Sequence, residues 1–241
     1  MTENAEYSEG FADNDGVKIF YRDYGPVGGD PVLMVHGLGA QLVHWPPHLI
    51  NFLKAHNFRP ITYDNRDVGL SSRFLGTPSF VLDYIKYFLR IPIKSEYTID
   101  DMADDGIKLL EQLNINQAHV LGTSMGGMIA QIISAQYPQK VKSFTLIAST
   151  ASTPSPMNAP AKPVRELMLE RSKNPDASVE DVIKREIKIV SLIGMKGRVV
   201  DTPEFREETI QNLNRAQDGS GYARQLLSIL ASKDRLKKIQ K

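Results

Sequence analysis

The sequence contains no cysteine, which excludes disulfides, thiol catalysis and zinc sites built on cysteine. It has no strong charge of either sign, because 29 Lys+Arg residues nearly balance 28 Asp+Glu residues. Nucleic-acid-binding domains usually carry a strongly basic face, so no nucleic-acid partner is expected. No apolar run approaches the roughly 18 residues of a membrane span, so no membrane association is expected either. The polar, acidic N-terminus does not resemble a secretory signal, and we expect a cytoplasmic protein.

Histidine is absent from the second half of the chain. The five histidines all lie in the first half: His36, His44, His48, His56 and His119. His44 and His48 have the spacing of two ligands on one helix face, but no carboxylate completes an H-E-x-x-H pattern. No metal site is therefore expected. His36 ends a predicted buried strand, which favours a structural role over a catalytic one.

The first half of the chain alternates strand and helix patterns, which predicts an α/β fold with a mostly parallel sheet and helices on both faces. Strands are expected at residues 17–24, 31–36, 59–64, 119–121 and 141–148. The strand at 17–24 alternates apolar and polar residues, as an antiparallel edge strand does. Helices are expected at residues 48–56, 98–113 and 128–137, with Thr98 as the cap of the second.

The pattern changes after residue 150. Four prolines between residues 152 and 163 indicate a semi-rigid linker. Only helical periodicity follows, at residues 164–172, 179–193, 203–216 and 222–239, with Ser178 and Thr202 as caps and Pro203 at a first helical position. We therefore expect a core at residues 1–150, a helical cap at 151–220, and a helix at 221–241 that returns to the core.

Ser124 lies in the sequence Gly122-Thr123-Ser124-Met125-Gly126, between a predicted strand and a predicted helix. This setting is typical of a nucleophile elbow, in which a strained serine projects above the sheet and the flanking glycines leave room for the turn. The helix N-terminus also presents free N–H groups toward the serine. A second motif, His36-Gly37-Leu38-Gly39, ends an earlier strand, so the amides of Leu38 and Met125 could together hold an oxyanion.

A third motif, the segment of residues 64–71, has the pattern Asp-x-Arg-x-x-Gly-x-Ser and follows another strand. With these motifs and a helical region after the last predicted strand, almost the whole chain resembles the α/β-hydrolase superfamily. It is most similar to the bacterial esterase group that contains aclacinomycin methylesterase. The resemblance implies a cofactor-free ester hydrolase with Ser124 as nucleophile, Leu38 and Met125 as oxyanion donors, and a bracing role for residues 64–71. Trp45 resembles a tryptophan of that group and could line the pocket or pack beneath the cap.

The sequence departs from the superfamily in one respect. The resemblance implies a triad ordered serine, acid, histidine. No histidine follows Ser124, and residues 148–152, where some relatives carry the acid, hold none. We expect the acid, the histidine and two further strands to lie beyond Lys241. The 241-residue chain alone should then be inactive and poorly soluble, because its sheet would have an open apolar edge.

The sequence thus predicts a serine-dependent hydrolase of small to medium carboxylic esters. Alternatives within serine chemistry are thioester, lactone, carbon–carbon and N-terminal proline peptide cleavage. Two other classes stay open: an inactive fragment or binding module, and a split enzyme completed by its own missing segment or by a second chain. The expected partner is a small-molecule ester, and the sequence leaves the oligomeric state open.

Overall fold

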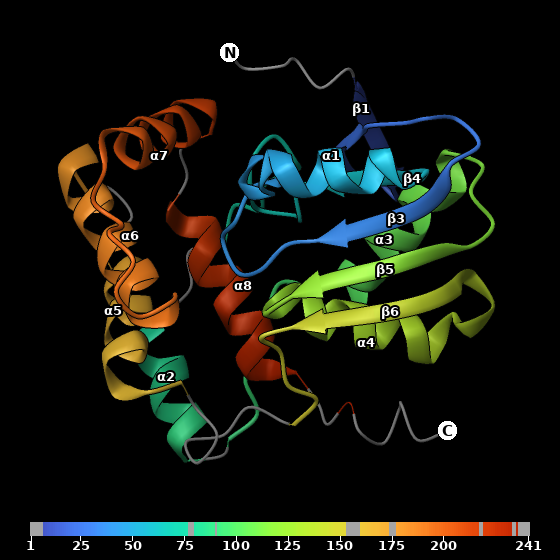
Figure 1. The fold of residues 1–241 in the computed structure, drawn as a ribbon. Coiled ribbons are helices and arrows are strands. Elements are labelled where there is room, and N and C mark those ends of the chain that lie inside the picture. Colours follow the sequence, from blue (N-terminus) through green and yellow to red (C-terminus); the bar gives the residue numbers. More distant parts are fainter. Residues whose placement is uncertain are drawn as a thin grey trace.

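The computed structural model describes residues 7–76, 80–89, 91–152, 160–173, 177–216, 219–232 and 235. Within them, the strands and helices alternate and then give way to helices (Figure 1). The strands are β1 (Ser8–Asn14), β2 (Val17–Asp23), β3 (Asp30–Val35), β4 (Phe58–Tyr63), β5 (Ala118–Thr123) and β6 (Val141–Ile147). The helices are α1 (Pro47–Ala55), α2 (Phe80–Phe88), α3 (Ile99–Gln112), α4 (Met125–Gln136), α5 (Lys162–Lys173), α6 (Val179–Ile193), α7 (Pro203–Arg215) and α8 (Gly219–Ala231). Short 3-10 turns occupy Leu42–His44 and Pro138–Lys140.

The described strands form one sheet in the order β1-β2-β4-β3-β5-β6. The pairs β1–β2 and β2–β4 are antiparallel, and the pairs β4–β3, β3–β5 and β5–β6 are parallel. The mostly parallel sheet predicted from the sequence is therefore confirmed. The expectation of an edge strand at residues 17–24 was wrong, because β1 pairs with β2 along its full length and takes the edge position.

Strand β3 shows why helices cover both faces of the sheet. Its side chains alternate between two cores, as the pleat of a strand requires. Leu33 and Val35 join the core on the side of α3 and α4, whereas Val32 and Met34 join a smaller core on the side of α1. Nearly continuous burial of an apolar strand is typical of an interior parallel strand.

The predicted helix caps are confirmed. The Thr98 hydroxyl accepts the N–H of Asp101, and the Asp101 carboxylate accepts the N–H of Thr98, which forms a capping box at the start of α3. The hydroxyls of Ser178 and Thr202 likewise accept backbone N–H groups in the first turns of α6 and α7. The predicted last helix differs, since α8 ends at Ala231 and most of residues 233–241 lie outside the described part.

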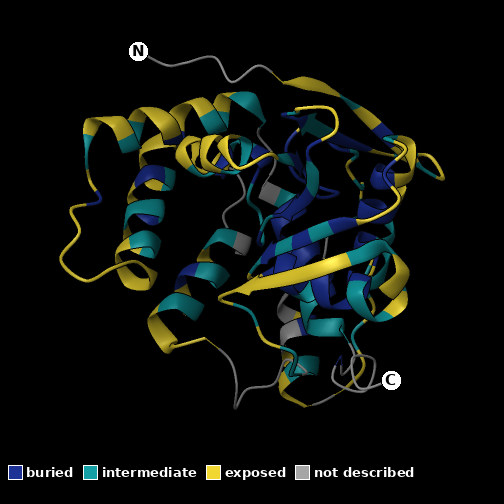
Figure 2. Cartoon of the chain, turned by 45° about the vertical axis from the view of Figure 1, so that its right-hand side comes forward, coloured by how far each residue is buried: buried dark blue, intermediate teal, exposed yellow. Residues whose placement is uncertain are grey.

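The helices after β6 stand at the carboxyl ends of β3, β5 and β6 (Figure 1). Helix α5 packs against α6 and α8, and α6 packs against α7. Figure 2 shows that the inner strands are buried, whereas β6 is exposed over nearly its full length. Its exposed side chains include Phe144, Leu146 and Ile147. The part of the linker at residues 153–159 lies outside the described residues.

Candidate functional site

Ser124 occupies a sharp turn between β5 and α4 at the carboxyl edge of the sheet. Its backbone has φ 52° and ψ −116°, a conformation that non-glycine residues rarely adopt. Strain of this kind costs about 1–3 kcal/mol and persists only where the surroundings hold the residue in place. Here the Ser124 N–H donates to the carbonyl of Ile147 at 2.9 Å, and the Ser124 carbonyl accepts the Ser149 hydroxyl at 2.8 Å. The side chain remains exposed.

Gly126 is required by a close approach of two backbone segments. A Cβ added at this position would lie 2.1 Å from the carbonyl oxygen of Val35 and 2.7 Å from that of His36. Only a residue without a side chain lets α4 start so close to the end of β3. A glycine is required at position 122 for a similar reason, because a Cβ added there would lie 2.3 Å from the carbonyl oxygen of Gly126.

The His-Gly loop after β3 lies directly against the serine. A Cβ built on Gly37 would lie 3.2 Å from the Cβ of Ser124 and 3.8 Å from its Oγ. The fold therefore brings together two motifs that are almost 90 residues apart in the sequence. Within the described residues, neither the Leu38 N–H nor the Met125 N–H donates a hydrogen bond. These two N–H groups, without a partner among the described residues, belong to the residues that directly follow Gly37 and Ser124.

His36 is engaged in its own loop. Its Nδ1 accepts the N–H of Gly37 at 2.9 Å, and its ring lies 4.6 Å from the Trp45 ring, centroid to centroid. Its Nε2 is buried and has no hydrogen-bond partner among the described residues. Burial lowers the pKa of His36 to about 4, with a further contribution from His44. The imidazole is therefore neutral at neutral pH and is a weak base.

Trp45 lies inside the molecule, with 6% of its surface exposed. It packs in the smaller core with Tyr24, Val32, Met34 and Ile50. Trp45 therefore packs in this core, whereas the sequence left open whether it lines the pocket or packs beneath the cap. In the described part of the chain, no group of three or more histidine, aspartate or glutamate side chains could hold a metal ion.

The acidic residues of the 64–71 segment each have a basic partner, so they are not a free acid pair. The buried Asp64 carboxylate accepts hydrogen bonds from the N–H of Leu42 at 2.7 Å and from Nη2 of Arg215 at 2.8 Å. The Asp67 carboxylate accepts two hydrogen bonds from the Arg224 guanidinium, at 2.9 and 2.8 Å. The expected bracing role is visible in these contacts, because they join the segment to α7, α8 and the loop after β3.

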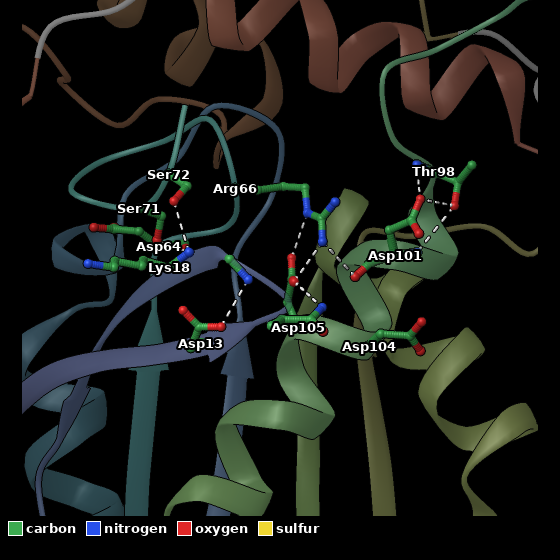
Figure 3. Close-up of polar contacts among 12 residues, drawn as sticks. Asp13, Lys18, Asp64, Arg66, Ser71, Ser72, Thr98, Asp101, Asp104 and Asp105 are labelled. Atoms are coloured by element: carbon green, nitrogen blue, oxygen red, sulfur yellow. Dashed lines mark hydrogen bonds and ion pairs between the residues drawn. The ribbon is translucent and has the colours of Figure 1, made fainter. Parts of the chain in front are cut away.

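Arg66 makes another buried ion pair of this segment. Its Nε and Nη2 donate to the two oxygens of Asp105 on α3, both at 2.7 Å, and Nη2 also donates to the carbonyl of Asp101 (Figure 3). Both side chains are at least 94% buried. The contacts agree with the expectation that Arg66 pairs structurally.

Sequence reasoning did not find the residues of α5 and α8 that hold the loop after β3. The Gly39 N–H donates to Oε1 of Gln225 at 2.8 Å, and the Gly39 carbonyl accepts Nη2 of Arg171 at 3.3 Å. The ring of Tyr222 lies so close that a Cβ at Gly39 would be 2.5 Å from it. These partners are more than 130 residues from Gly39, and no sequence motif marks them.

Comparison with known proteins agrees with this architecture. Residues 30–183 match the alpha/beta hydrolase fold family. The chain is 24% identical over 212 residues to rhodomycin D methylesterase of Streptomyces peucetius. The alignment covers 82% of this chain and 66% of that protein. A rhodomycin D methylesterase from another Streptomyces is 25% identical over 211 residues, covering 81% of this chain and 65% of that protein. The chain thus spans slightly less than two thirds of these relatives.

Among solved structures, a carboxylesterase structure from the archaeon Nitrososphaera superposes with a TM-score of 0.70 at 19% identity, covering 96% of this chain and 76% of the other. At that identity the superposition establishes the fold. Among the described residues, no helix is long and apolar enough to cross a membrane. The family match covers more than half of the sequence, and the chain belongs to the alpha/beta hydrolase fold family.

Proposed function

We propose that this protein hydrolyses carboxylic esters through an acyl-enzyme on Ser124. One observation carries the proposal: an exposed serine in a strained turn lies against Gly37, and the N–H groups of the next residues, Leu38 and Met125, have no partner in the described residues. The similarity to two methylesterases supports an ester as substrate over a thioester, a lactone, a carbon–carbon bond or a peptide.

In the proposed reaction, the Ser124 oxygen attacks the acyl carbon, and its proton passes to a base. The amides of Leu38 and Met125 donate hydrogen bonds to the tetrahedral oxyanion, and each such donor is typically worth about 100- to 1000-fold in rate. The base then returns the proton to the departing alcohol. Water, deprotonated by the same base, cleaves the acyl-enzyme and restores the serine.

The base is proposed to come from outside this sequence. All five histidines are described, and none of them forms a hydrogen bond with Ser124. We propose that a histidine and its acid come from a further segment or from a second chain. We also propose that residues 151–220 form a cap over the serine. The rival class is a non-catalytic binding module that keeps the fold and lacks the chemistry.

A fluorophosphonate probe tests this proposal directly. The full-length protein should form one covalent adduct, and peptide mass mapping should place it on Ser124. The control is Ser134→Ala, which removes a partly buried hydroxyl of α4 that, among the described residues, donates to the Ala130 carbonyl. That variant should label as the wild type does. An unlabelled protein, or an adduct on another residue, would favour the binding module.

A further inference from the structure

Two arginines in the helices beyond the strand ends share one carboxylate. Nη1 of Arg171 on α5 lies 3.4 Å from Oε1 of Glu186, and Nε of Arg185 on α6 lies 4.0 Å from the same oxygen. The Arg171 and Glu186 side chains are about three-quarters buried. One carboxylate therefore faces two guanidinium groups, and the charge of the exposed Glu170 also acts on Arg185.

Arg185 is the unusual member of the pair. Its side chain is 92% buried, since only 8% is exposed, and its Nε has no hydrogen-bond partner among the described residues. The contact with Glu186 at 4.0 Å is too long for a hydrogen bond. Burial lowers the pKa of Arg185, and the neighbouring charge of Arg171 lowers it further. Buried polar groups without partners are rare in proteins, and a buried charge without a close partner is costly.

The cluster adjoins the loop that lies against the serine. Arg171 donates to the Gly39 carbonyl, and its guanidinium stacks over the Tyr222 ring at 4.4 Å. Gly39 lies two residues after Gly37, and Gly37 contacts Ser124. Helices α5 and α6 stand across from the carboxyl ends of β3 and β5 (Figure 1). A group bound by Arg185 would thus lie on the side of Ser124 where the loop of residues 36–39 lies.

We propose that Arg185, with Arg171 beside it, binds a carboxylate on the substrate, so that the enzyme prefers esters that carry a free acid group. The proposal rests on the function proposed for Ser124. A guanidinium binds a carboxylate through two parallel N–H···O hydrogen bonds, which match its planar geometry. A substrate carboxylate would bind the Nη groups of Arg185, because its Nε is closed to solvent, while Glu186 remains paired with Arg171.

Two methyl esters of similar length test the preference in the full-length protein. Monomethyl glutarate carries a carboxylate, and methyl hexanoate is neutral. Arg185→Met should lower kcat/KM for monomethyl glutarate by about 10- to 100-fold, the range expected for lost charged hydrogen bonds. It should leave kcat/KM for methyl hexanoate unchanged. Arg198→Met, which removes an exposed arginine in the loop after α6, is the matched control and should change neither value.

Two measurements separate this proposal from the function proposed for Ser124. Calorimetry should detect monomethyl glutarate binding to Ser124→Ala, and the added substitution Arg185→Met should abolish it. Hydrolysis by Ser124→Ala would overturn the serine mechanism and leave the binding result intact. With wild-type protein, glutarate should competitively inhibit the hydrolysis of methyl hexanoate. This measurement does not depend on whether an Arg185 variant folds. Absence of that inhibition, or an equal loss for both esters in Arg185→Met, would overturn the carboxylate subsite.

Discussion

Oε1 of Gln225 accepts a hydrogen bond of 2.8 Å from the backbone N–H of Gly39, a residue 186 positions earlier in the chain. The other end of the same amide donates to the carbonyl of Arg66, also at 2.8 Å. Gln225 is fully buried. One side chain of α8 therefore fixes both the loop that contacts Ser124 and the bracing segment after β4.

Gln225→Leu should reduce ester hydrolysis mainly through kcat. The substitution frees the peptide next to Leu38, whose N–H is the proposed oxyanion donor, so the transition state should lose more than the bound substrate. We expect kcat to fall by about tenfold or more, with a smaller change in KM. Steady-state kinetics of the full-length protein would check this. Gln225→Glu keeps the acceptor for Gly39 and should recover part of the loss.

The control for this pair is Gln211→Leu, which removes an exposed glutamine of α7 whose hydrogen bond within the described residues goes to Glu207. It should change neither constant. If Gln225→Leu raised KM and left kcat unchanged, Gln225 would act on substrate binding and not on the oxyanion donor.

His36 should make the fold less stable in mild acid. Burial holds the pKa of His36 at about 4, below the value of 6.5 for an unperturbed histidine. Between these two pH values the unfolded chain binds a proton that the folded protein does not. Stability should therefore fall as pH decreases from 6.5 toward 4, at up to about 1.4 kcal/mol per pH unit from this group.

His36→Asn tests that expectation, because asparagine keeps an acceptor for the Gly37 N–H and does not titrate. Urea unfolding at several pH values should show a weaker loss of stability below pH 6.5 than the wild type shows. His48→Asn replaces an exposed histidine and should behave as the wild type does. An unchanged pH dependence in His36→Asn would contradict the assignment.

Asp105→Asn should be strongly destabilising. It leaves the buried Arg66 guanidinium without its two charged hydrogen bonds, and breaking a buried ion pair typically costs about 3–5 kcal/mol. Asp104→Asn is the neighbouring control, since Asp104 is partly exposed and, among the described residues, accepts a hydrogen bond from the Tyr137 hydroxyl. Urea unfolding midpoints of both variants would compare them. Equal, small effects would show that the Arg66–Asp105 pair contributes little.

The sequence patterns could predict the elements that local chemistry determines. The turn at Ser124 follows from its two flanking glycines, and the start of α3 follows from Thr98 and the carboxylate three residues later. The motif of residues 36–39 correctly indicated a loop near the serine, because the ends of neighbouring parallel strands meet at one edge.

Contacts between distant segments could not be predicted in the same way. Strand β1 was missed because only Phe11 and Ala12 of its seven residues are apolar, and it forms by pairing with β2. Helix α2 was missed as well; among its described side chains, the apolar Leu82, Ile85 and Phe88 are exposed and do not mark a core-facing stripe. Gln225 lies in an ordinary helical pattern, and only the fold brings it to Gly39.

The central claim is that Ser124 is the nucleophile of an ester hydrolase. The direct measurement is p-nitrophenyl acetate hydrolysis by the full-length protein, by Ser124→Ala and by Ser134→Ala, each with a matching circular dichroism spectrum. We predict that Ser124→Ala lowers kcat by at least about 1000-fold and that Ser134→Ala keeps wild-type activity. A correctly folded Ser124→Ala variant that still turned over the ester near the wild-type rate would contradict the account.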